Sequence, residues 1–74
     1  SRDVFLDHDR TAEAVARQLA QTERIALSRG YAIAIGHPHN VTIDALRNWM
    51  PSAAERGFVM VPLSAIVRHR LGEG

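Results

Sequence analysis

The chain has 74 residues, of which 46% are hydrophobic and 23% charged, and nine basic and eight acidic side chains give it a net charge of +1. This length allows one small domain, and the composition is that of a globular protein rather than a disordered segment. The absence of cysteine excludes disulfides and thiol chemistry. The basic residues are scattered arginines, so we expect no nucleic-acid-binding surface, and no apolar run is long enough for a membrane span.

The first half of the chain predicts a strand, a long helix and a second strand. The first strand is expected over residues 3–7, and Asp9 is the expected N-cap of a helix over residues 10–29. Gly30 is expected to end this helix, and residues 31–36 read as a strand buried on both faces. The apolar positions of the helix recur at helical spacing: Ala12, Val15, Ala16, Leu19 and Ala26.

The second half predicts a helix, a strand and a final short helix. Thr42 is the expected N-cap of the second helix, and Pro51 either ends that helix or, less often, begins a further turn. Residues 58–61 are expected to form the third strand, and Ser64 to cap a helix over residues 65–71. The apolar side of the second helix carries three large side chains, and of these Trp49 is expected to pack in the core rather than to stack on a sugar: Leu46, Trp49 and Met50.

The resulting order, β-α-β-α-β-α, predicts an α/β fold with a parallel sheet. Three parallel strands alone leave two open sheet edges, which proteins normally avoid. We therefore expect residues 1–74 to be part of a larger domain whose other strands come from an amino-terminal segment or from another chain. On this view the chain associates with itself or with that missing part.

His37 is the strongest candidate for a functional residue. It follows the second expected strand directly after Gly36, and Pro38 favours an extended conformation for it. Ligands of parallel α/β sheets bind at the carboxyl ends of the strands, and an imidazole there can transfer a proton near neutral pH. Asp7 ends the first strand at the same edge, where it either orients His37 or contacts substrate, or else competes with Asp9 to cap the first helix.

His39 forms a His-x-His pair with His37, a spacing that places two imidazoles on one ion in some metal hydrolases. The intervening proline and the lack of an evident third ligand argue against such a site. We therefore expect no metal or other cofactor to be bound by this chain alone.

Two strings at a fixed separation make a more specific pattern: RDVFLD at residues 2–7 and AIAIGHP at residues 32–38, followed by VPLS at residues 61–64. The stretch between AIAIGHP and VPLS contains further residues of the pattern: Thr42, Leu46, Trp49, Pro51 and Gly57. This pattern resembles the carboxyl-terminal part of the divergent polysaccharide deacetylase family, and the resemblance covers nearly the whole chain.

The resemblance implies a distorted (β/α) barrel related to the NodB-type carbohydrate esterases, with this chain forming roughly its last third. Those enzymes hydrolyse N-acetyl groups of sugars with a divalent metal, usually zinc, held by an aspartate and two histidines in amino-terminal motifs that this chain does not contain. His37 matches the histidine of their closing motif, which acts as a general acid. A polysaccharide or amino-sugar substrate and a location in the periplasm or cell envelope are implied in the same way.

Two other functions remain open. The first is a non-catalytic carbohydrate-binding or envelope scaffold protein that keeps the barrel without the chemistry. The second is a free-standing small α/β interaction module. Sequence upstream of residue 1 discriminates the enzyme from the scaffold, because paired aspartates and metal-ligand histidines there favour the enzyme.

Overall fold

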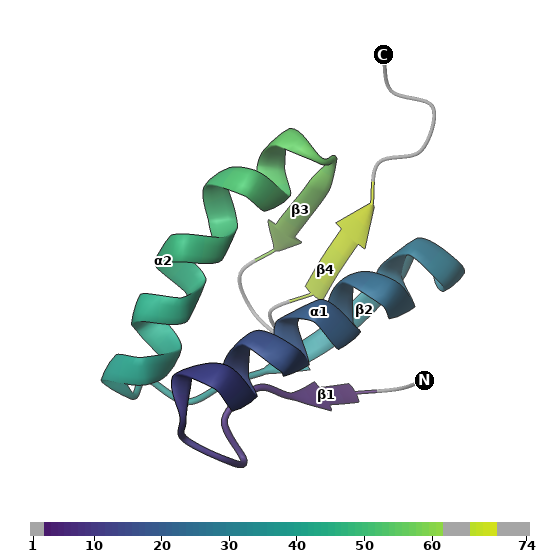
Figure 1. The fold of residues 1–74 in the computed structure, drawn as a ribbon. Helices are drawn as coiled ribbons and strands as arrows, with labels where there is room; N and C mark the ends of the chain where they lie inside the picture. The colour runs from purple at the N-terminus through teal and green to yellow at the C-terminus, as the bar shows by residue number, and fades with distance from the viewer. Residues whose placement is uncertain (1–2, 62–65, 70–74) are drawn as a thin grey trace.

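The computed structural model describes residues 3–61 and 66–69, which form an α/β fold with two helices and four strands (Figure 1). Its elements in chain order are β1 Asp3–Phe5, α1 Ala12–Arg29, β2 Tyr31–Ile35, α2 Asn40–Glu55, β3 Phe58–Val61 and β4 Ile66–His69. All three predicted strands and both long predicted helices are present, with bounds that differ by a few residues.

The four strands form one sheet in the order β1-β2-β4-β3. The prediction that the first two strands pair in parallel is confirmed, with Asp3 opposite Ile33 and Phe5 opposite Ile35. β4 pairs antiparallel with both β2 and β3, so β3 runs in the same direction as β2 without being its neighbour. The sheet is therefore mixed rather than wholly parallel.

The predicted final helix over residues 65–71 is wrong, because the described residues 66–69 form β4. Two β-branched residues, Ile66 and Val67, open this segment and favour a strand. Placed between β2 and β3, β4 also pairs an edge of each that would otherwise be open. Ser64, predicted as the cap of that helix, lies outside the described residues.

Helix α1 begins two residues later than predicted, because Thr11 rather than Asp9 is its N-cap. The Thr11 side chain accepts a hydrogen bond from the Ala14 backbone N–H at 3.1 Å, which satisfies one of the donors left free at a helix start. Gly30 ends the helix as predicted. Its φ of 90° is left-handed, and its N–H donates to the Ala26 carbonyl at 2.7 Å.

Helix α2 begins at Asn40 with His39 at the N-cap position, so Thr42 lies inside the first turn and is not the cap. The helix does not end at Pro51 but continues through it to Glu55, so Pro51 lies inside a single helix. Gly57, two residues after the end of the helix, has a left-handed φ of 89°. Within the described residues no helix is long and apolar enough to cross a membrane.

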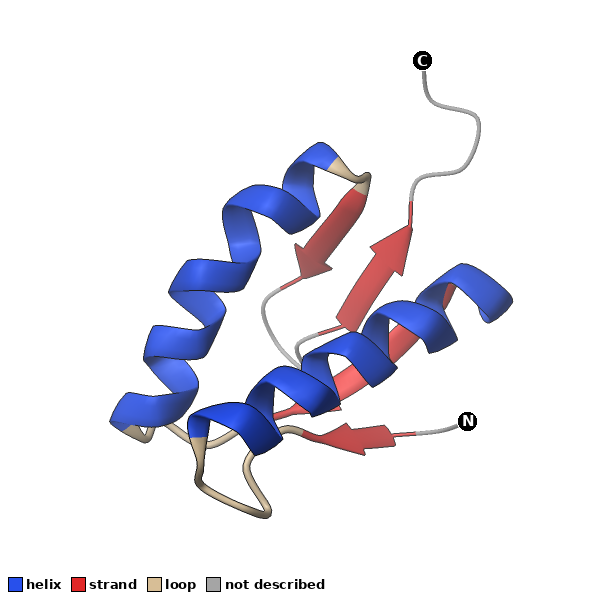
Figure 2. Ribbon diagram, viewed as in Figure 1, coloured by secondary structure: helices blue, strands red, loops and turns tan. Residues whose placement is uncertain are grey.

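Both helices cover the same face of the sheet (Figure 2). The even-numbered strand residues Val4, Ala32 and Ala34 are buried against them, as is Phe58 of β3. The helix residues that complete this core are Ala14, Val15, Leu19, Ala26 and Ala53. Alternating burial along β1 and β2 thus fixes which side of each strand faces the helices.

A polar network ties α1 to α2 above this core. The carboxylate of Glu23 accepts hydrogen bonds from the Trp49 indole N–H and from both terminal nitrogens of Arg56. These hydrogen bonds lower the pKa of Glu23, and those from Arg56 have a larger effect than the one from Trp49. The Trp49 ring also packs against the core, as predicted, with its centroid 6.4 Å from that of Phe58.

The opposite face of β1 and β2 is apolar apart from Asp3 and is not covered by the described residues. Phe5 is 54% exposed and Tyr31 45% exposed, and Ile33 and Ile35 are partly exposed beside them. Apolar strand faces of this kind normally pack against a further layer. One face of the sheet is therefore packed against the helices, and the other exposes apolar side chains that a further layer would bury.

We predict that the isolated chain associates through this face at micromolar concentration. Phe5→Lys places a charge there without disturbing the helix-covered core, and it should shift the chain toward monomer. Sedimentation velocity measures the change, with Leu27→Lys, at a helix position 55% exposed, as the matched control. A compact monomer for the unmodified chain at these concentrations would refute the prediction.

Candidate functional site

The parallel register of β1 and β2 brings Asp7 and His37 together. Each strand residue lies opposite the residue 30 positions later, from Asp3 and Ile33 to Phe5 and Ile35. The next bond in the series joins the Leu6 N–H to the Ile35 carbonyl at 2.8 Å. Asp7 and His37 each lie two residues beyond their strand, so they meet at the carboxyl edge of the sheet, as predicted.

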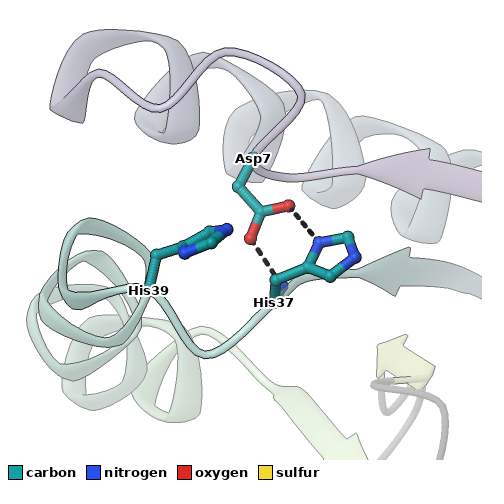
Figure 3. A group of neighbouring side chains, drawn as sticks. All are labelled: Asp7, His37 and His39. Atoms are coloured by element: carbon teal, nitrogen blue, oxygen red, sulfur yellow. Dashed lines mark hydrogen bonds and ion pairs between the residues drawn. The ribbon is translucent and has the colours of Figure 1, made fainter.

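Three hydrogen bonds hold the carboxylate of Asp7. Its Oδ2 accepts from the backbone N–H of His37 and, at 2.8 Å, from the Thr42 hydroxyl. Its Oδ1 lies 2.9 Å from Nδ1 of the His37 ring (Figure 3). The Asp7 side chain is only 1% exposed, whereas that of His37 is 63% exposed, so a buried acid orients an accessible imidazole.

These contacts keep Asp7 ionised and orient the ring of His37. Burial alone raises the pKa of Asp7, but the hydrogen bonds from the His37 ring, the His37 backbone and Thr42, together with the charge of His37, lower it to about 2. The carboxylate is then ionised at neutral pH and can only accept hydrogen bonds. Nδ1 of His37 must therefore carry the proton, which leaves Nε2 as the atom that exchanges protons with a ligand.

Gly36 is needed at the site for space, not for an unusual backbone conformation. A Cβ at this position would lie 3.1 Å from Thr42 Cγ2, 3.3 Å from Leu6 Cδ1 and 3.7 Å from Asp7 Oδ2. Only Gly30 and Gly57 have a positive φ among the described glycines, so the backbone at Gly36 does not itself require a glycine. The missing side chain lets the strand end pack directly against Asp7 and Thr42.

His39 completes a group of three potential metal ligands. One ligand atom each from Asp7, His37 and His39 lies within 4.8 Å of the other two, and the two imidazole centroids are 5.8 Å apart (Figure 3). The sequence argument against a metal assumed that no third ligand lay near the two histidines. That assumption is wrong, because the strand register delivers Asp7 to them. An aspartate with two histidines is a donor set that suits zinc.

An apolar cavity of about 260 Å³ opens beside His37. It lies between the end of β2 and the exposed turn of α2, with Gly36, His37 and Pro38 at one side. Its other walls are apolar side chains, apart from the Thr42 side chain, and are formed by Leu6, Leu19, Ala34, Ile43, Leu46 and Trp49. The site thus places an accessible imidazole next to a mostly apolar cavity.

The comparison with protein families decides the relationship. The model of the divergent polysaccharide deacetylase family matches residues 1–67. The chain belongs to the divergent polysaccharide deacetylase family. Searches of curated proteins and of solved structures each returned no match.

The sequence predicted Asp7 and His37 at the same sheet edge, but it did not predict the contact of Thr42 with Asp7. Thr42 was predicted as a helix cap, whereas the buried hydroxyl donates to Asp7 across 35 residues of sequence. Placement in the first turn of a helix that follows a strand end was the available signal, because such a residue faces the same sheet edge.

We predict that Thr42→Val destabilises the protein by about 1.5–3 kcal/mol, the usual contribution of a hydrogen bond to a charged group. Valine keeps the shape of threonine and removes the hydroxyl, so Asp7 Oδ2 loses one of its two donors. Thr42→Ser keeps the hydroxyl and should recover much of this loss. Urea unfolding of both variants measures the difference, and equal destabilisation by valine and serine would contradict the role assigned to the hydroxyl.

The lowered pKa of Asp7 predicts a specific acid sensitivity. Because the folded-state pKa is about 2 against an ordinary value of 3.8, ionised Asp7 stabilises the fold above about pH 4. This contribution is lost as the pH falls toward 2. Asp7→Asn cannot titrate, so its free energy of unfolding should fall less steeply between pH 5 and pH 2.

Urea unfolding at several pH values gives both slopes. Glu23 also has a lowered pKa, but it is present in both proteins and cancels in the comparison. Identical slopes for the two proteins would show that Asp7 is not held ionised in the fold.

Proposed function

We propose that this chain is the carboxyl-terminal part of a (β/α) barrel that removes N-acetyl groups from envelope carbohydrate, with His37 as the general acid. Membership of the deacetylase family supports the reaction class. Support for the barrel comes from the helices on one face of the sheet and from the exposed apolar side chains of Phe5, Ile33 and Ile35 on the other, which would line a barrel interior. The chain alone is expected to be inactive.

The observation that carries the proposal is the buried Asp7 carboxylate held 2.9 Å from Nδ1 of an exposed histidine. An ionised acid on Nδ1 fixes the ring orientation and directs Nε2 outward. Pairs of this kind serve proton transfer in many hydrolases, because the acid also stabilises the imidazolium. The pair lies at the strand ends, where sites of parallel α/β folds form.

In amide hydrolysis, a water oxygen adds to the acetyl carbonyl, and the carbon–nitrogen bond then breaks. The departing amine is strongly basic and needs a proton as it leaves. In the proposed step the His37 imidazolium gives the proton on Nε2 to that nitrogen and keeps the proton that Nδ1 shares with Asp7. The family resemblance implies a divalent metal, held by residues outside this chain, that supplies carbonyl polarisation and an activated water.

The cavity beside His37 suits the acyl side of such a substrate. Its walls are almost wholly apolar, and a methyl group gains from leaving water there. The sugar would then lie on the solvent side of the imidazole, which is where the leaving nitrogen must be. The periplasm or cell envelope is the location that fits this substrate.

We predict that His37→Ala in the protein that carries this chain lowers turnover of an N-acetylated sugar polymer by about 10²- to 10⁴-fold, the usual range for a general acid. Substrate binding should change much less, because the proton is transferred mainly in the transition state. His39→Ala should cost little by comparison. His8→Ala changes an exposed histidine next to Asp7 and is the matched control.

Release of acetate and of free amines, followed against substrate concentration, separates turnover from binding. Unchanged turnover with His37→Ala, or equal losses for His37→Ala and His39→Ala, would mean that the imidazole is structural. Carbohydrate binding without any hydrolysis by the unmodified protein would favour the non-catalytic scaffold instead.

A further inference from the structure

The proposed proton transfer uses Asp7 and His37 and leaves His39 without a task, although its imidazole lies in the same group (Figure 3). His39 is half-buried at the N-cap position of α2, and its side chain makes no capping hydrogen bond. Its ring faces Asp7 and His37 in the view of Figure 3. A half-buried imidazole aimed at a second imidazole and an anionic carboxylate points to a shared cation.

We propose that Asp7, His37 and His39 form a site for a divalent transition-metal ion of the Zn²⁺ type. The ligand set has one carboxylate oxygen and two imidazole nitrogens, which zinc binds at about 2.0–2.2 Å. Three protein ligands leave a fourth position of a tetrahedral ion open to water or another ligand. This site is distinct from the metal site that the family resemblance implies, whose ligands lie outside this chain.

The rigid part of the site is the carboxylate. Thr42 and the His37 backbone N–H both bind Oδ2, whereas the His37 ring is the described partner of Oδ1. The proton that Nδ1 of His37 shares with Oδ1 occupies the place where an ion would sit between these atoms. Binding therefore releases that proton and puts the ion between Oδ1 and the ring nitrogen.

The remaining movement is small and falls on the accessible side chains. Ligand atoms around a tetrahedral zinc are about 3.3–3.5 Å apart for bonds of this length. The three atoms now lie within 4.8 Å of one another, so the imidazoles must close by about 1.5 Å at most. Because the His37 side chain is 63% exposed, rotation of its ring does not require the core to open.

The electrostatic balance favours a cation at this point. Asp7 brings a carboxylate that is held by hydrogen bonds from the His37 backbone, the His37 ring and Thr42. The N-terminus of α2 opposes a cation with a partial charge of about +0.5. No lysine or arginine contacts the Asp7 carboxylate among the described hydrogen bonds and ion pairs, so an ion does not have to displace a fixed positive group.

A metal in this site would withdraw His37 from proton transfer, because the imidazole cannot hold the ion through Nδ1 and keep its hydrogen bond to Asp7. An excess of zinc would then inhibit the hydrolysis. This consequence rests on the proposed function, whereas binding of the ion does not.

Titration of the chain with ZnCl₂ by isothermal calorimetry tests the site directly. We expect one ion per chain with a dissociation constant below about 10 µM, and release of protons that appears as a dependence of the heat on the buffer. Co²⁺ provides a second readout, because its visible absorption bands report tetrahedral coordination by nitrogen and oxygen.

The variants assign the ligands. His37→Ala and His39→Ala should each weaken Zn²⁺ binding at least about tenfold, a loss no smaller than that for changing a residue that only supports a ligand. His8→Ala, which removes an exposed histidine outside the group, should leave it unchanged. Circular dichroism confirms that each variant keeps its helices.

Binding weaker than about 10 µM, or binding that survives either His37→Ala or His39→Ala, would overturn the proposal. Because these measurements need no substrate, they fail separately from the proposed function. Zinc binding by an inactive protein would support the metal site and contradict the deacetylase function. Activity without zinc binding at this site would support the deacetylase function and contradict the metal site.

Discussion

The burial of the Asp7 carboxylate is the constraint on which the rest of the site depends. A carboxylate with 1% exposure loses its water, and the cost is acceptable only if donors replace that water. All of its donors come from the segment after β2: the His37 backbone, the His37 ring and the Thr42 hydroxyl. Satisfying one acid therefore fixes the strand end, the following loop and the first turn of α2 against β1. The same bonds that stabilise the fold set the direction of the imidazole.

The parallel pairing of β1 and β2 makes this arrangement possible. With a constant offset of 30 residues, the two strand ends advance together and deliver Asp7 and His37 to the same point. Gly36 removes the side chain that would otherwise separate them, since a Cβ there would press on Thr42 and Leu6. A slip of one residue in this register would turn His37 to the other face and leave Asp7 buried without its donors. The register of β1 and β2 therefore determines the geometry of the site.

The sequence predicted what local patterns determine. Helical spacing and Gly30 placed α1, and the apolar run before Gly36 placed β2, because these signals act within one element. It failed where contacts are distant in sequence. The last segment was predicted as a helix, but β4 is decided by its pairing with β2 and β3. Thr42 was predicted as a cap because its true partner, Asp7, lies 35 residues away. The grouping of Asp7 with both His37 and His39 was missed for the same reason.

In the proposed metal site, the ion would compete with the proton for the position between Asp7 Oδ1 and His37 Nδ1. The proton needs only these two residues, so a site built for proton transfer alone gives no reason for His39 to face the pair. A metal ion uses all three side chains, but it requires both imidazoles to be deprotonated. The identity of the third side chain, rather than the Asp7–His37 pair itself, is what separates the two uses of this strand edge.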